Sequence, residues 1–231
     1  MLNTAKEVIE ACKKDNIHIY DLVLQGETKA LKMTEEEMKN KIREILEVMK
    51  GSSQETLEKS FETEYKMIDG FAKMMNDYQK EKDPLTSKFL VRAMAMAFST
   101  SETNANMGTI AAAPTAGSSG IMPAALMAAK EKYGLDDEVL INGLLTSIGI
   151  GQIIGKYATF AGAEGGCQAE CGSASAMAAA ALVEMLGGSP EEALNAASIT
   201  LINVMGLACD PIAGLVEYPC TFRNASGVMN S

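Results

Sequence analysis

Three cysteines lie where the chain is expected to pass between loops and helices. The segment CDPIAGLVEYPC (209–220) begins and ends with a cysteine, and each of the two cysteines is close to a proline. Cys167 follows Glu-Gly-Gly, where glycines let the backbone approach a bulky group closely. Three thiolates held on irregular backbone suit an iron–sulfur cluster or a zinc ion, and three free buried thiols fit the same pattern.

The spacing of these cysteines argues against two common metal sites. A closed zinc site takes four Cys or His ligands, often in CxxC pairs, but the chain has no CxxC and its one histidine, His18, is remote in sequence. An electron-transfer cluster takes four closely spaced cysteines. A cubane cluster held by three cysteines would instead leave one iron open, and an open iron can act as a Lewis acid on a substrate oxygen. The residues alone leave this hypothesis and that of inert thiols both open.

The other two of the five cysteines suggest no ligand role. Cys12 lies in an amphipathic N-terminal helix beside two lysines, which indicates an incidental thiol. Cys171 follows Cys167 by four residues and would share its helix face, so the two could form a ligand pair. The Ala, Gly and Ser residues around Cys171 favour a small core residue.

The segment PTAGSSG (114–120) is a glycine-rich loop with three hydroxyl side chains, Thr115, Ser118 and Ser119, ahead of an expected helix. Such a loop presents backbone N–H groups and the positive end of a helix dipole, which favours an anion. It lacks the Gly-Lys-Ser/Thr of a nucleotide loop, so a carboxylate is the preferred ligand. An ordinary turn with a serine cap is the alternative.

Two basic residues complete the candidate site. Arg223 lies three residues after Cys220 and could hold a carboxylate through two hydrogen bonds. Lys156 lies in a sparsely charged stretch and is a candidate base or anion partner, although a lysine at a helix end also satisfies the last carbonyls.

Composition and charge exclude several classes of protein. The chain has 231 residues, 20 basic and 30 acidic, with a net charge of −10 and no basic cluster, which argues against nucleic acid or an anionic membrane as partner. We expect no signal peptide, no apolar run long enough to span a bilayer, and reduced thiols in a cytoplasmic protein.

The elements that must position these residues are predicted to be helices. Tryptophan is absent and aromatics make up 5%, whereas methionine and alanine are abundant, which favours closely packed helices over strands. Capping signals at Thr34, Ser52 and Ser189 and apolar periodicity predict helices, after an N-terminal one, over 38–50, 56–79, 85–107, 124–134, 136–158, 168–188 and 192–208. We therefore predict one all-α domain over 1–231 whose outer helices come from the N-terminal third and whose Gly/Ala-rich central helices and loops carry the site. The last ten residues show no terminal helix, so we expect either that a C-terminal tail is missing or that another chain covers this edge.

Three long segments, 114–126, 162–188 and 206–225, strongly resemble the α subunit of bacterial iron–sulfur L-serine dehydratases, and the likeness covers essentially the whole chain. The resemblance implies that a [4Fe–4S] cluster is held by Cys167, Cys209 and Cys220. It further implies that L-serine is bound by Thr115, Ser118, Ser119, Arg223 and Asn224. Cys171 departs from the apolar residue expected at its position, so no ligand role is carried over to it.

The resemblance also implies an activity and partners. The expected reaction is β-elimination from L-serine to pyruvate and ammonia without pyridoxal phosphate, with Lys156, a nearby thiolate or hydroxyl, or a partner residue as the base. A separate β subunit and an oligomeric enzyme are expected. The alternatives are a related lyase acting on threonine or cysteine, and a non-catalytic helical scaffold with inert thiols.

Overall fold

The computed structural model describes residues 4–231, and within that range every regular element is a helix. The α-helices are α1 Ala5–Asp15, α2 Ile19–Leu31, α3 Glu35–Gln54, α4 Phe71–Glu81, α5 Lys88–Ala105, α6 Ile121–Tyr133, α7 Asp137–Tyr157, α8 Gly162–Gly165, α9 Cys167–Met185, α10 Pro190–Val204 and α11 Cys220–Asn230. Two short 3₁₀ turns, η1 Ala116–Ser118 and η2 Ile212–Gly214, interrupt the loops. The predicted all-α class is confirmed.

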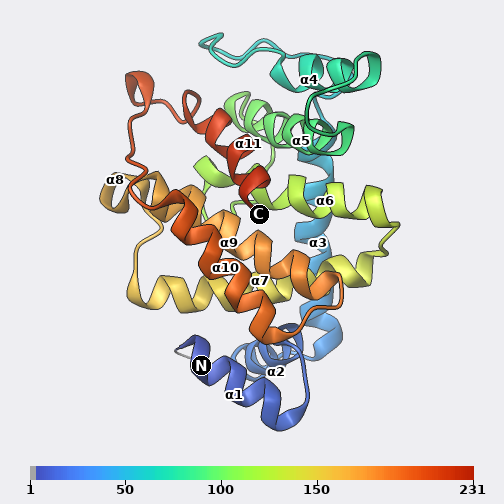
Figure 1. Cartoon of the computed structure of the whole chain (residues 1–231), viewed down its shortest axis with the longest axis vertical. Coiled ribbons are helices and arrows are strands. Elements are labelled where there is room, and N and C mark those ends of the chain that lie inside the picture. Colours follow the sequence, from blue (N-terminus) through green and yellow to red (C-terminus); the bar gives the residue numbers. More distant parts are fainter. Residues whose placement is uncertain (1–3) are drawn as a thin grey trace.

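Helix α9 lies at the centre of the fold and packs against α7, α10 and α6 (Figure 1). Its middle is almost entirely alanine, and its residues from Cys171 to Ala181 are all buried. Small side chains let neighbouring helices approach closely, as where Gly143 of α7 faces Met185 and Gly172 faces Val204 of α10. In Figure 1 the α1–α2 pair closes one end of the molecule, and α4 lies at the other end.

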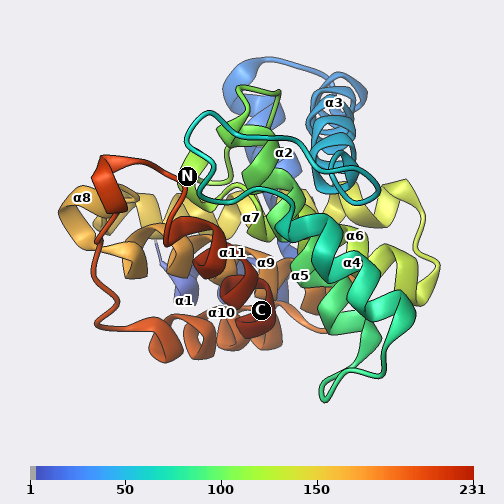
Figure 2. The ribbon, with the colours of Figure 1, turned by 90° about the horizontal axis from the view of Figure 1, so that it is seen from above.

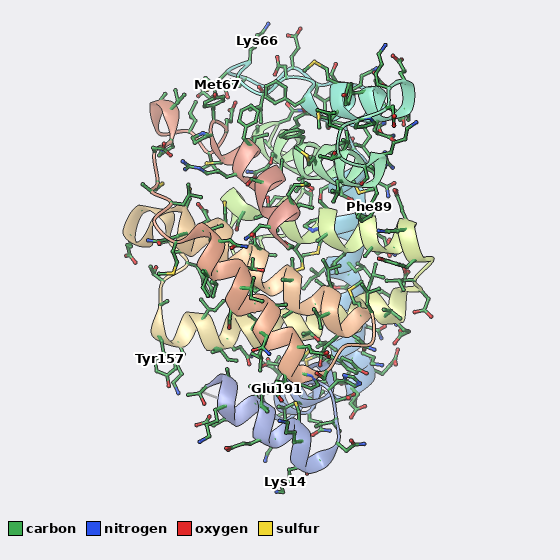
Figure 3. The ribbon with its side chains drawn as sticks, in the orientation of Figure 1. Lys14, Lys66, Met67, Phe89, Tyr157 and Glu191 are labelled. Carbon is green, nitrogen blue, oxygen red and sulfur yellow. The ribbon has the colours of Figure 1, made fainter. Side chains whose placement is uncertain are left out.

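Buried carboxylates join separate elements. Glu184 of α9 accepts hydrogen bonds from the backbone N–H of Ile19 (2.9 Å) and from the Thr146 hydroxyl (2.5 Å). Glu102 of α5 accepts from the backbone N–H of Ala72 (3.0 Å), in the first turn of α4. An exposed ion pair of 2.7 Å joins Lys13 of α1 to Glu191 of α10, which Figure 3 shows beside α1.

Several predicted boundaries are confirmed and two predictions are wrong. The capping boxes at Thr34 and Ser189 begin α3 and α10 as expected. Ser52 does not begin a helix, because α3 continues through it to Gln54. In place of the predicted helix 56–79 the chain has irregular backbone, from which Leu57 and Ile68 enter the core, followed by the shorter α4. The last residues, expected to be irregular, form α11.

Helix α7 also corrects an expectation. The helix has 21 residues, and an 18-residue window within it, with a mean hydropathy of 1.4, is long and apolar enough to cross a bilayer; half of that window is buried inside the protein. A core helix of a folded domain has the same composition, so this one helix is weak evidence for a membrane.

Candidate functional site

The three predicted ligand cysteines come together from three separate parts of the chain. Cys167 is the first residue of α9, Cys220 is the first residue of α11, and Cys209 lies in the irregular segment after α10. Figures 1 and 2 both show α8, the start of α9 and the segment leading to α11 on the same side of the molecule. Cys167 and Cys220 are buried, whereas Cys209 is exposed.

Arg223 ties two of these segments together. Its Nη1 donates to Cys167 Sγ (2.9 Å) and to the carbonyl of Ala208 (3.0 Å). Its Nη2 forms an ion pair of 2.5 Å with Asp210 Oδ1. The guanidinium therefore holds the segment around Cys209 against the start of α9.

The thiols influence one another's ionisation, which shows that they share one electrostatic environment. A hydrogen bond from Cys171, helped by Arg223, lowers the pKa of Cys167 against the opposing effect of burial. Burial, and next the charge of Cys167, raise the pKa of Cys220 to about 11. Burial and the same neighbouring charge raise the pKa of Cys209. Cys167 is thus the thiol that is most easily ionised.

The loop 114–120 lies beside the cysteines and is fastened to α11. Asn224 is buried, its Oδ1 accepts from the backbone N–H of Gly120 (2.8 Å), and its Nδ2 donates to the carbonyl of Gly117 (2.6 Å) and to that of Cys220 (2.8 Å). Asn224, which the sequence predicts to bind substrate, therefore holds the loop in place through hydrogen bonds from its side chain to the loop backbone.

The hydroxyls of the loop make contacts within it. Ser119 donates to the carbonyl of Ala116 (2.7 Å), and Ser118 Oγ lies 3.0 Å from Thr115 Oγ1. Ser118 and Ser119 are almost fully buried. The loop that carries all three is held to α11 by Asn224, and their substrate contacts remain a prediction.

Glu170 is a member of the site that the sequence analysis missed. It lies one turn after Cys167 on α9, is half-buried, and its Oε1 accepts a 2.5 Å hydrogen bond from Thr115 Oγ1. A signal was present in the sequence: at three residues after Cys167, a carboxylate shares the same helix face.

Lys156, the candidate base, lies on α7, which carries none of the three cysteines. It is near the end of α7 and lines a cavity of about 570 Å³ with Pro114, Gln152 and Phe160 among others. Its Nζ lies 5.5 Å from the centroid of the Tyr157 ring, which Figure 3 shows at the end of α7, pointing away from the body of the protein. A base role for this lysine remains a prediction.

The family model for the serine dehydratase α chain matches residues 14–231. The chain belongs to the serine dehydratase α-chain family. That assignment confirms the resemblance drawn from the three segments of sequence.

Relatives agree over the length of the chain. The L-serine dehydratase α chain of Peptoniphilus asaccharolyticus is 66% identical over 231 residues, which are all of this chain and 79% of that protein. The L-serine dehydratases of Mycobacterium tuberculosis and Helicobacter pylori are 36% and 32% identical, over 96% and 99% of this chain and 49% and 51% of those proteins.

In this serine dehydratase α chain, Cys167, Cys209 and Cys220 are the donors that the expected cluster would use. Within residues 4–231 no group of three or more His, Cys, Asp or Glu side chains could hold a metal ion. An iron–sulfur cubane is wider than an ion and takes cysteines that lie further apart. The charge of Cys167 raises the pKa of Cys209 and of Cys220, and binding to iron would relieve that cost because the ligand form is the thiolate.

The two remaining cysteines differ in their surroundings. Cys12 is buried between α1 and its neighbours, and burial raises its pKa to about 11. Cys171 belongs to the hydrophobic core, and its hydrogen bond to Cys167 together with burial raises its pKa. Its place in the core agrees with the interpretation of Cys171 as a small core residue.

Proposed function

We propose that this chain is the α subunit of an L-serine dehydratase that converts L-serine to pyruvate and ammonia at a [4Fe–4S] cluster. The convergence of Cys167, Cys209 and Cys220 beside the loop 114–120 is the observation that carries this proposal. Membership of the family, and relatives named as L-serine dehydratases, support it. The name α chain supports a separate partner subunit, as the proposal expects.

The reaction must expel hydroxide from the β-carbon and remove a weakly acidic α-proton. A cluster held by the three cysteines would supply an open iron that acts as a Lewis acid on the β-hydroxyl. Loss of the α-proton and of the hydroxyl, as water, leaves 2-aminoacrylate. Its tautomer takes up water and releases ammonia and pyruvate.

The residues of the chain supply the geometry that this chemistry needs. Arg223 holds the Cys209 segment against Cys167 through the contacts to Ala208 and Asp210. Asn224 holds the loop 114–120 in place beside the cysteines. Fixed placement of the two sides of a site is what makes substrate orientation effective.

Iron analysis of anaerobically purified protein tests the proposal first. We expect iron and acid-labile sulfide in the parent protein, pyruvate formation from L-serine, and loss of all three in Cys209→Ala and Cys220→Ala. Cys12→Ala is the matched control, because Cys12 is a buried thiol that is remote in sequence from the site. Full activity in Cys209→Ala or Cys220→Ala would contradict the ligand assignment, and an iron-free parent protein would leave the scaffold alternative.

Comparison of substrates tests the specificity. L-serine, L-threonine and L-cysteine are offered to the same cluster-loaded enzyme, and L-serine is expected to give the highest kcat/KM. A higher value for threonine or cysteine would favour the related lyase.

A further inference from the structure

We propose that Glu170 is the residue that receives the α-ammonium group of the amino-acid substrate. The inference rests on the proposed function, because it assumes an amino acid in the site. The contacts assigned so far provide for the substrate hydroxyl and carboxylate, and no group in them carries the charge that an ammonium needs. Glu170 supplies that charge.

The carboxylate of Glu170 is fixed between two backbone segments. A Cβ on Gly117 would lie 2.5 Å from Glu170 Oε1, and a Cβ on Gly162 would lie 2.8 Å from Oε2. A side chain at either position would push the carboxylate aside, so glycine at both positions leaves the carboxylate where it is. The Thr115 hydroxyl then fixes Oε1 by its hydrogen bond. One oxygen of the carboxylate is therefore held in place by a neighbouring hydroxyl.

The same carboxylate lies against the candidate ligands. The position of a Cβ on Gly162 is 3.5 Å from Cys209 Sγ as well as 2.8 Å from Glu170 Oε2. The negative charge of Glu170 opposes the lowering of the pKa of Cys167 and adds to the rise in the pKa of Cys220. A substrate whose hydroxyl is beside the cysteines would thus have its ammonium within reach of Glu170.

The charge of Glu170 has no partner of opposite sign in the described part of the chain. Its Oε2 has no hydrogen bond or ion pair within residues 4–231. Arg223, the nearby cation, binds Cys167 and Asp210 instead. A half-buried carboxylate with one oxygen fixed and the other unpaired suits a ligand that brings a positive charge and several N–H donors, as an α-ammonium does.

This placement changes the role of Thr115. Its hydroxyl donates to Glu170, so it orients the ammonium receptor, and the substrate carboxylate is left to the rest of the loop. Thr115 is in this view a positioning residue.

Kinetics of the cluster-loaded enzyme with its partner subunit test the proposal. Glu170→Gln keeps the shape and the Thr115 contact but removes the charge, and we expect the KM for L-serine to rise about ten- to a hundred-fold with iron content unchanged. Glu170→Asp keeps the charge and should restore part of the affinity. Glu164→Gln is the control, since Glu164 is an exposed carboxylate of α8 and should leave KM unchanged. A fall in kcat with an unchanged KM would overturn the proposal, and so would loss of iron in Glu170→Gln.

Two unreactive probes separate this inference from the proposed function. L-alanine and L-lactate differ by an ammonium in place of a hydroxyl, and neither has a β-hydroxyl to lose. By calorimetry we expect the parent protein to prefer L-alanine, and Glu170→Gln to lose that preference while its weak affinity for L-lactate stays the same. No preference in the parent, or an equal preference in the variant, would refute the role of Glu170. Because no turnover is needed, this result holds even if the parent forms no pyruvate from L-serine.

Discussion

Gly166, at the start of α9, is the position where one added methyl group should most damage the site. Its backbone has φ +80° and ψ 174°, a region that is populated essentially by glycine alone. A Cβ there would also lie 2.6 Å from the carbonyl oxygen of Leu207. That oxygen accepts a 3.0 Å hydrogen bond from the backbone N–H of Gln168 and so joins the Cys209 segment to α9.

The expected loss of stability for Gly166→Ala follows from these contacts. Backbone strain in this region costs about 1–3 kcal/mol. Displacement of Leu207 and loss of its hydrogen bond add about 1–2 kcal/mol. We therefore expect the free energy of unfolding to fall by about 2–5 kcal/mol.

Gly187→Ala is the matched control because Gly187 also has a positive φ, +88°, but nothing lies within 4 Å of its added Cβ. Its cost should be the strain of a left-handed residue, about 1–2 kcal/mol. Urea unfolding followed by circular dichroism gives both values for the cluster-free chains. Equal losses in the two variants would refute the argument that Leu207 is displaced.

The site gives a second readout of the same variant. Movement of Leu207 carries the Cys209 segment with it, so Gly166→Ala should hold less iron than Gly187→Ala after identical anaerobic loading. Equal iron content would show that the segment tolerates the shift.

Two further predictions concern buried polar groups. Asn224→Ala leaves the N–H of Gly120 and the carbonyl of Gly117 without their hydrogen-bond partner, so the free energy of unfolding in urea should fall by about 2–4 kcal/mol. The exposed Asn203→Ala is the control and should lose less than about 0.5 kcal/mol. Similar losses in both variants would contradict the role of Asn224 in holding the loop. Burial raises the pKa of Glu102, so the native state binds the proton of this carboxyl more tightly than the unfolded state does. The free energy of unfolding of the parent should therefore fall as the pH rises from below the ordinary pKa of 4.5 through the raised pKa. Glu102→Gln should remove this decline in urea midpoints measured at several pH values, and a decline of the same size in the variant would assign it to other groups.

Local signals in the sequence were sufficient for most of the helices. Thr34, Ser189 with Pro190, and Asp136 each begin a helix through a hydrogen bond to a backbone N–H three residues on, and Gly134 ends α6 in the left-handed conformation. These contacts involve residues that are neighbours along the chain, so the pattern of residue types contains them. The family resemblance was likewise recognised from the sequence alone, because the three segments that carry it are continuous stretches of the chain.

The limits of the prediction appear where a distant residue decides a local conformation. Ser52 and Glu55 have the spacing of a capping box, but α3 passes through Ser52, which is buried near Thr100 of α5. Glu102, thirty residues after Ala72, accepts a hydrogen bond from that residue in the first turn of α4. Tertiary packing outweighs a cap that contributes about 1 kcal/mol.

The composition of the site depends on the same long-range contacts. The family resemblance selected Cys167, Cys209 and Cys220 from the sequence, but only the fold brings α9, α11 and the segment after α10 to one side of the molecule (Figure 2). Glu170 gained its place through a hydrogen bond to Thr115, fifty-five residues away, and Asn224 through bonds to a loop more than a hundred residues away. Spacing along the chain predicts hydrogen bonds between residues that are near neighbours in sequence. Contacts between distant segments depend on how all the helices pack, so only the tertiary structure determined them.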